Sequence, residues 1–425
     1  MKRIFVLFVA CLLSVSAAFA SRGSSDYSVT VTAVVHQGTS GARVTVTSSP
    51  ADSVITHLQL KVFSAAGGLL SVLNTDGNGT GVVVVDGVAA TAGQSVQAKA
   101  NVIDRSIAAR VRPCTASAVV IAPPENATIT ILQGDLLYPI GLAANSTSLF
   151  WTERWDSPWG QDETSQGRIW MSGLDGSNPH VIATGQSSPV GIAADDTVVY
   201  WANFGNGLND GSIVKYDLAT AQMTTVVTGE PGLGTAVTLV NGTLFWSGSG
   251  IWSLAANGTR VLLSIESAVN MASDGISLFW TEYAMGPGNA GRVMKMPLGG
   301  GPATALASDQ PQAWDVHTDG TSVVWSDQAW QQPFPSTINR MPIGGGPAQT
   351  LASGNEIMKN FAIDSDWAYF VDSGVLYVVP LAGGPVSVLA ASVAPGGAPE
   401  GNMVVSGHNV YWTDTQSQAV MRASW

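Results

Sequence analysis

The chain has 425 residues, of which 45% are hydrophobic and 11% are charged, and its formal net charge is −12. This length is enough for two domains of ordinary size. An acidic, lysine-poor chain cannot hold nucleic acid by neutralising its phosphates, so we expect no nucleic-acid partner.

The first 20 residues have the pattern of a cleaved signal peptide. Lys2 and Arg3 precede an apolar run at 4–17, and Ala18-Phe19-Ala20 supplies the small residues of a cleavage site. The apolar run is too short for a membrane span, so no transmembrane segment is expected. Lipidation of Cys11 is a weaker alternative because that cysteine lies very early. We predict a secreted or periplasmic protein cleaved after Ala20.

Residues 25–121 are predicted to form a small β-sandwich. Stretches rich in β-branched residues, several of them alternating in polarity, occupy 28–35, 42–47, 55–63, 81–85, 95–102 and 108–121. Turn residues such as those at 74–79 separate the stretches. About seven short strands in this length are typical of immunoglobulin-like or fibronectin-like domains. Residues 122–126 then form a short, proline-containing linker.

From residue 127 to 425 one pattern occurs seven times: small apolar residues, a polar turn, and a strand-like stretch that ends in a pair of bulky residues. The pairs are Phe150-Trp151, Tyr200-Trp201, Phe245-Trp246, Phe279-Trp280, Val324-Trp325, Tyr369-Phe370 and Tyr411-Trp412. Successive pairs are 34 to 50 residues apart, which is the spacing of four-stranded propeller blades. The predicted fold class is therefore all-β: a seven-bladed β-propeller preceded by a small β-sandwich.

The two ends of the repeat region predict how the ring closes. The last repeat stops after its third strand, and the segment 127–133 resembles the outer strands predicted at 303–308 and 348–354. We expect 127–133 to complete the last blade, which would remove open sheet edges.

Two repeats carry a recognisable family motif. The phrases Ser277-Leu278-Phe279-Trp280-Thr281-Glu282 and Val410-Tyr411-Trp412-Thr413-Asp414 resemble the YWTD-type propeller repeat. The continuation at 291–301, GRVMKMPLGGG, is similar to that of exported bacterial propellers of uncharacterised function. This resemblance covers residues 127–425 and implies the propeller fold. It does not imply a lipoprotein-receptor role, because eukaryotic YWTD receptors have six blades and cysteine-rich neighbours.

One propeller face is predicted to carry the long connections, at 153–167, 203–211, 282–291 and 327–337, whereas the other face has short turns. Variable loops on a rigid scaffold commonly bind ligands. The aromatic candidates for binding a sugar or a protein partner are Trp155, Trp159, Tyr283, Trp330 and Phe334. Alternatively, these side chains fold back under their own loops.

Two further rings of residues are candidates on this face. The first lies two positions after each closing aromatic: Glu153, Asn203, Gly248, Glu282, Asp327, Asp372 and Asp414. Five of these seven are acidic, which could suit a divalent cation such as Ca²⁺. Because the acids recur in nearly every blade, we favour a structural role in which each caps backbone N–H groups of its own loop.

The second ring lies at the start of the inner strands, beside the axial channel: Gly141, Gly191, Ala236, Asn270, Asp315, Asn360 and Asn402. Propeller enzymes that resemble gluconolactonases and virginiamycin B lyase place metal or catalytic groups near here, usually Glu or His. Asp315 is accordingly the candidate metal ligand, whereas His317 is expected to pack between blades. The favoured interpretation is a hydrogen-bonded polar plug or a water-filled channel.

We predict no catalytic residue and no required cofactor. The favoured function is an exported, non-enzymatic binding or scaffold protein that presents the loop-rich face to a protein or cell-surface glycan. The alternative is a metal-assisted hydrolase or lyase with its site at the channel mouth.

Overall fold

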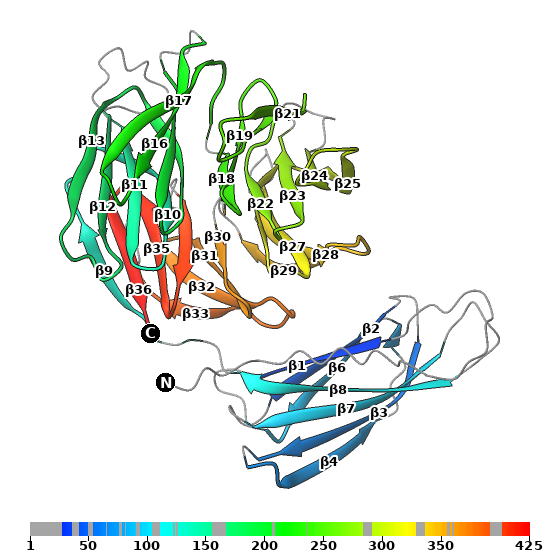
Figure 1. Cartoon of the computed structure of the whole chain (residues 1–425). Coiled ribbons are helices and arrows are strands. Elements are labelled where there is room, and N and C mark those ends of the chain that lie inside the picture. Colours follow the sequence, from blue (N-terminus) through cyan, green and yellow to red (C-terminus); the bar gives the residue numbers. More distant parts are fainter. Residues whose placement is uncertain are drawn as a thin grey trace. The chain divides into compact units, whose positions relative to one another are not determined.

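The computed structural model describes two separate all-β units (Figure 1). The described residues are 28–35, 42–49, 54–64, 66–75, 79–80, 82–90, 94–103, 111–121, 124, 126–154, 167–205, 209–234, 236–283, 291–328, 336–354, 358, 361–391 and 402–425. The predicted signal peptide lies outside them. Along the chain, the N-terminal unit ends at Pro123 and the propeller unit begins at Pro124. No helix long and apolar enough to cross a membrane occurs among the described residues.

The described residues of the N-terminal unit form eight strands. They are β1 (Ser28–Val35), β2 (Ala42–Ser49), β3 (Val54–Phe63), β4 (Leu69–Thr75), β5 (Gly79–Thr80), β6 (Val82–Val88), β7 (Ser95–Ile103) and β8 (Val111–Ile121). The hydrogen-bonded order is β4-β3-β7-β8-β1-β2-β6, with β5 beside β3. β1 joins β8 through two residue pairs only, Ala33 with Val120 and Val34 with Ile121.

Alternate residues of distant strands in this order share one core. Val44 and Val46 of β2 are buried in the same cluster as Leu58 and Leu60 of β3 and Ala98 of β7. Since successive side chains of a strand point to opposite faces, the two ends of the strand order must face each other across this core. This arrangement agrees with the predicted small β-sandwich; the immunoglobulin-like subtype stays a prediction.

The propeller contains seven four-stranded antiparallel sheets, which confirms the predicted fold class. Blade 1 is β10 (Tyr138–Ala144), β11 (Ser148–Arg154), β12 (Gly167–Gly173) and β13 (His180–Gln186); blade 2 is β14 (Pro189–Ala194), β15 (Val198–Asn203), β16 (Gly211–Asp217) and β17 (Gln222–Glu230); blade 3 is β18 (Val237–Val240), β19 (Thr243–Ser247), β20 (Ile251–Leu254) and β21 (Arg260–Ser264). Blade 4 is β22 (Met271–Ser273), β23 (Ser277–Glu282), β24 (Gly291–Pro297) and β25 (Thr304–Gln310); blade 5 is β26 (Ala313–Thr318), β27 (Ser322–Gln328), β28 (Ser336–Pro342) and β29 (Gln349–Gly354); blade 6 is β30 (Phe361–Ile363), β31 (Trp367–Asp372), β32 (Val375–Pro380) and β33 (Ser387–Ala390).

Blade 7 combines both ends of the propeller sequence. Its strands are β34 (Met403–Ser406), β35 (Asn409–Asp414), β36 (Ala419–Ser424) and β9 (Thr128–Gln133). β9 pairs antiparallel with β36, so that Ile131 lies opposite Met421 and Thr128 opposite Ser424. The outer strand of the last blade thus precedes the first blade in the chain, and the ring is closed by backbone hydrogen bonds.

The closing pair of each repeat joins its blade to both neighbours. Phe150 of blade 1 packs in one cluster with Trp201 of blade 2, and Tyr200 packs with Trp246 of blade 3. The same relation holds for Phe279 and Trp325, and for Tyr411 and Trp151 across the closure. Adjacent residues of a strand point to opposite faces, so one member of the pair fills each of the two interfaces of a blade.

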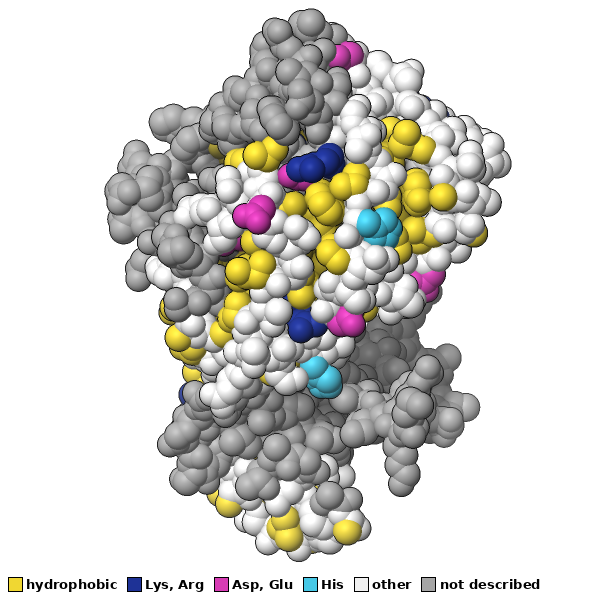
Figure 2. All heavy atoms as spheres, turned by 90° about the vertical axis from the view of Figure 1, so that its left-hand side faces the viewer, with side chains coloured by type: hydrophobic (Ala, Val, Ile, Leu, Met, Phe, Trp, Pro, Cys, Tyr) yellow, Lys and Arg dark blue, Asp and Glu magenta, His cyan; other side chains and the backbone are white. Residues whose placement is uncertain are grey.

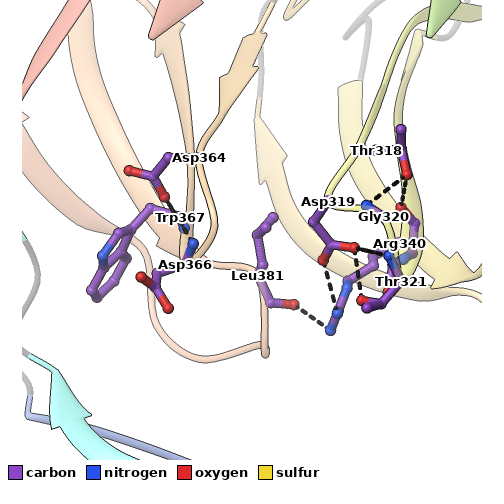
Figure 3. Close-up of polar contacts among 10 residues, drawn as sticks. Thr318, Asp319, Gly320, Thr321, Arg340, Asp364, Asp366, Trp367 and Leu381 are labelled. Carbon is purple, nitrogen blue, oxygen red and sulfur yellow. Dashed lines mark hydrogen bonds and ion pairs between the residues drawn. The ribbon is translucent and has the colours of Figure 1, made fainter. Parts of the chain in front are cut away.

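The turns between first and second strands use one device in five blades. In blade 5, Oδ1 of Asp319 accepts the backbone N–H groups of Thr321 (2.7 Å) and Ser322 (2.6 Å). Asn145, Asp195, Asp274 and Asp364 make the equivalent turns. Figure 3 shows the turns of blades 5 and 6, which Arg340 links by donating to Oδ2 of Asp319 (3.2 Å) and to the carbonyl of Leu381 (2.9 Å). Side-chain acceptors satisfy the turn N–H groups and fix the geometry.

Candidate functional site

A cavity of about 270 Å³ lies on the propeller axis, among residues of the inner strands. Six blades line it, through 142–144, 192–194, 237–239, Asn270–Met271, Asp315–His317 and Asn402–Val404. The structure therefore brings Asn270, Asp315 and Asn402 together around one cavity. Asn360, the other amide of the predicted ring, lies outside the described residues.

Asp315 is the most highly coordinated residue of the cavity. It is 3% exposed, and its Oδ1 accepts Nδ2 of Asn270 (2.5 Å) and the N–H of Val316 (2.9 Å). Its Oδ2 contacts Nε2 of His317 (3.2 Å) and accepts the N–H of Phe361 (3.3 Å). These partners come from blades 4, 5 and 6, so the carboxylate joins three blades at the axis. Both oxygens already have two partners, which leaves little capacity for a metal ion.

His317 combines the expected inter-blade packing with a second role. Its ring lies edge-on to Phe361 of blade 6, with 4.7 Å between centroids, and its side chain is 29% exposed on the cavity wall. Burial disfavours the charged imidazolium, but the charge of Asp315, its hydrogen bond and the backbone of Phe361 outweigh that effect and raise the pKa of His317. The contact with Asp315 therefore favours the protonated form of His317 relative to a free histidine.

The acidic residues after the closing aromatics form separate contacts in their own blades. Glu153 accepts Arg168 (2.6 Å) and the indole N–H of Trp170 (2.6 Å). In blade 4, Glu282 accepts the indole N–H of Trp280 (2.9 Å) and Nε of Arg292 (2.6 Å). A structural role is thus observed for these residues, although the partners are indole and guanidinium groups of the same sheet and not only loop N–H groups.

Loop capping of the expected kind occurs in blade 7. Asp414 accepts the backbone N–H groups of Gln416 (2.9 Å) and Ser417 (3.1 Å). Asn203 of the same ring donates to Gln186 (3.0 Å), and Asp372 accepts the hydroxyl of Ser373 (3.2 Å). Within the described part of the chain, no three His, Cys, Asp or Glu residues are grouped so as to hold a metal ion.

Of the predicted loop aromatics, Tyr283 is the one that the structure describes; Trp155, Trp159, Trp330 and Phe334 lie outside the described residues. Tyr283 follows β23 and packs edge-on against Trp314, with 5.8 Å between ring centroids. Burial raises the pKa of Tyr283. Trp314 directly precedes Asp315 on the inner strand of blade 5, so this aromatic pair lies next to the polar residues of the axis.

Sequence reasoning missed the hydroxyl residue that directly follows most closing aromatics. Thr152 accepts the N–H of Gly141 (2.8 Å) and donates to the carbonyl of Val190 in blade 2 (2.9 Å). Thr281 likewise accepts the N–H of Asn270 (3.3 Å) and donates to Trp314 of blade 5 (2.7 Å). We call this contact the threonine latch. Thr413 makes the donor half across the ring closure, to the carbonyl of Ile140 at 2.6 Å.

The fold and this site define the class of the protein: a closed seven-bladed β-propeller with a polar cluster on its axis, following a small all-β N-terminal unit. No family model and no curated protein matches the chain.

Solved propeller structures are similar to it at low identity. The β-propeller domain of the trilobed protease from Pyrococcus furiosus is 11% identical, with a TM-score of 0.49 over 68% of this chain and 96% of that one. TolB from Acinetobacter baumannii is 10% identical, with a TM-score of 0.40 over 79% and 77%. The calcium-binding protein regucalcin from Agrobacterium tumefaciens is 16% identical, with a TM-score of 0.38 over 56% and 90%. These likenesses concern the fold alone.

Proposed function

We propose that this protein is an exported, non-enzymatic binding protein whose loop-bearing propeller face holds a protein or a cell-surface glycan. Within this proposal the propeller belongs with the YWTD-like exported bacterial propellers that its repeats resemble, and the segment 1–20 is a cleaved signal peptide. The observation that carries the proposal is the coordination of Asp315, the candidate metal ligand of the enzymatic alternative. Its oxygens are used to join blades 4, 5 and 6.

The same coordination favours binding over the alternative of a metal-assisted hydrolase or lyase. A hard cation such as Ca²⁺ needs several carboxylate or carbonyl oxygens with free lone pairs. Binding a cation through Asp315 would require the loss of contacts to Asn270, His317 or the backbone of Phe361.

The lengths of the connections support the loop-bearing face as the binding surface. Connections between second and third strands span 155–166 in blade 1, 283–290 in blade 4 and 329–335 in blade 5. The turns at the opposite end, such as 145–147 and 319–321, are short and held by their own side chains. Rigid scaffolds commonly carry binding residues on such long loops.

On the side shown in Figure 2, charged side chains are isolated and hydrophobic ones gather between them. This side includes β9 and β13 in Figure 1, and Ile131 of β9 is 61% exposed. Aromatic loop residues beside Asp, Asn and Gln are suited to stacking on sugar rings or to anchoring a protein.

The test is a triple variant, Trp155→Ala, Trp159→Ala and Trp330→Ala, compared with the wild type on immobilised glycans and on intact cells of the source organism. We expect at least roughly tenfold weaker binding by the variant, because aromatic anchors commonly dominate binding energy. The control is Ile276→Ala, which removes an apolar side chain that is 77% exposed in a turn at the opposite end of the blades. Equal binding by the triple variant and the wild type would contradict the proposal.

A further inference from the structure

The axial cavity has two different walls. On blades 1 to 3 the ring positions are Gly141, Gly191 and Ala236, and the cavity is lined by apolar residues apart from Thr238. On blades 4, 5 and 7 the ring positions are polar: Asn270, Asp315 and Asn402. Leu142, Ile192 and Val237 are among the lining residues of blades 1 to 3, whereas Asn270, Asp315 and Asn402 line the cavity on blades 4, 5 and 7. If the channel served stability alone, we would expect side chains to fill it, because native cores leave few voids.

The two titratable groups on the polar wall contact each other. Nε2 of His317 lies 3.2 Å from Oδ2 of Asp315, and this neighbour raises the pKa of His317. Asp315 and the backbone of Phe361 are the groups that raise that pKa, and Asn270 contacts Asp315 from blade 4. The cavity therefore contains no unpaired charge among its described lining residues.

Hydrogen-bond donors remain on this wall. Asn270 uses one N–H of its amide on Asp315, while its oxygen accepts the N–H of Met271 (2.8 Å), so one N–H is left. The side-chain amide of Asn402 makes no hydrogen bond within the described chain, and its backbone N–H and carbonyl are used by Ile140 and Thr413. Two amide groups thus offer N–H donors to the cavity.

We propose that the axial cavity binds a small uncharged organic molecule, with a carbonyl group on the amides of Asn270 and Asn402 and an apolar body against blades 1 to 3. An anion would meet the carboxylate of Asp315, and a cation would find both oxygens of that carboxylate already occupied by Asn270, His317 and two backbone N–H groups. Either would lose its hydration without gaining a free counter-ion among the described lining residues, which disfavours a buried charge. This site is separate from the loop aromatics, so its test does not depend on the proposed function.

The test uses three probes of similar size and different charge: benzamide, benzoate and benzylammonium, titrated into the full-length protein at pH 7 by calorimetry. Each probe fits within 270 Å³. We expect saturable binding of benzamide and at least roughly tenfold weaker binding of both ions. Absence of benzamide binding up to its solubility, or equal or tighter binding of either ion, would overturn the proposal.

Three variants locate the site. Asn402→Ala removes a donor and should weaken benzamide binding roughly three- to tenfold, the effect of one hydrogen bond. Ala193→Leu enlarges a lining residue that also packs in the core between blades 2 and 3, and it should weaken or abolish binding by narrowing the cavity. Asn257→Ala, in an exposed turn of blade 3, is the matched control and should bind as the wild type does. If Ala193→Leu does not fold, Asn402→Ala decides alone: unchanged affinity in that variant places benzamide elsewhere and refutes the assignment.

Discussion

At the scale of single residues, Asp327 has the least favourable environment of the acids that follow the closing aromatics. It is 4% exposed, its Oδ2 accepts the indole N–H of Trp325 and the amide of Asn339, both at 2.9 Å, and its Oδ1 has no partner among the described residues. Burial raises its pKa from 3.8 to about 6 despite these hydrogen bonds. Asp327 therefore favours the folded state when protonated and opposes it when ionised.

This sign gives a prediction for the variant Asp327→Asn. Because the folded-state pKa is the higher one, the contribution of Asp327 is fully present below about pH 4 and is lost as the pH rises through about 6. A rise of about two units corresponds to a loss on the order of 3 kcal/mol. The amide introduced by the substitution would keep an oxygen for Trp325 and Asn339, so the variant should lack this loss. Urea unfolding of both proteins at pH 4, 6 and 8 measures the difference.

The control for this experiment is Asp196→Asn. Asp196 is exposed, and hydrogen bonds from Ser146 lower its pKa. The variant should therefore have the same change in unfolding free energy between pH 5 and pH 8 as the wild type. If Asp327→Asn retained the full pH dependence of the wild type, Asp327 would not be the group responsible.

At the scale of the strand and the blade, the threonine latch joins each inner strand to its neighbour. In blade 1, Ile140 and Gly141 both lie opposite Thr152, because the register shifts between Pro139 and Leu142. The hydroxyl of Thr152 replaces the backbone partner that this bulge removes. A Cβ at Gly141 would come within 2.1 Å of the carbonyl of Val190, so the close approach of blades 1 and 2 requires glycine there.

We predict that Thr281→Val destabilises the protein by about 1–3 kcal/mol, the cost of leaving buried polar groups unpaired. Valine has the same shape but leaves the N–H of Asn270 and the carbonyl of Trp314 without their partner. Thr304→Val on the exposed outer strand β25 is the control and should change stability by less than about 0.5 kcal/mol. Thermal or urea unfolding measures both, and equal effects of the two substitutions would argue against the latch.

The sequence predicts the blades better than the contacts between them. The closing aromatics recur at a fixed place, so their burial follows from period and alternation alone, and Trp151, Trp201 and Trp280 are all fully buried. The partners of Thr281 and Asp315 lie in other blades, and one sequence does not state which strand faces which. His317 was expected to pack between blades. Its contact with Asp315, two residues earlier on β26, agrees with the alternation of side chains along a strand, whereas the contacts of Asp315 with Asn270 and Phe361 come from other blades.

At the scale of the whole molecule, the ring depends on β9. Comparing two truncated proteins, residues 124–425 and residues 134–425, tests this dependence. The first keeps the outer strand of blade 7, whereas the second leaves β36 as an open edge and uncovers its backbone groups. We expect the shorter protein to melt at least roughly 10 °C lower and to aggregate on size-exclusion chromatography. Equal melting temperatures would mean that β9 is not needed for closure.

The position of β9 also has a consequence for the order of folding. Gln133 pairs with Val420, which follows it by 420 − 133 = 287 residues, whereas the strands of the other blades pair within one repeat. During synthesis β9 emerges first of all the propeller strands, yet its partner emerges last. Contacts between distant parts of a chain form slowly because a long loop must close first. We therefore expect blades 1 to 6 to form locally, while the pairing of β9 with β36 is the slow, final step that commits the chain to its native state.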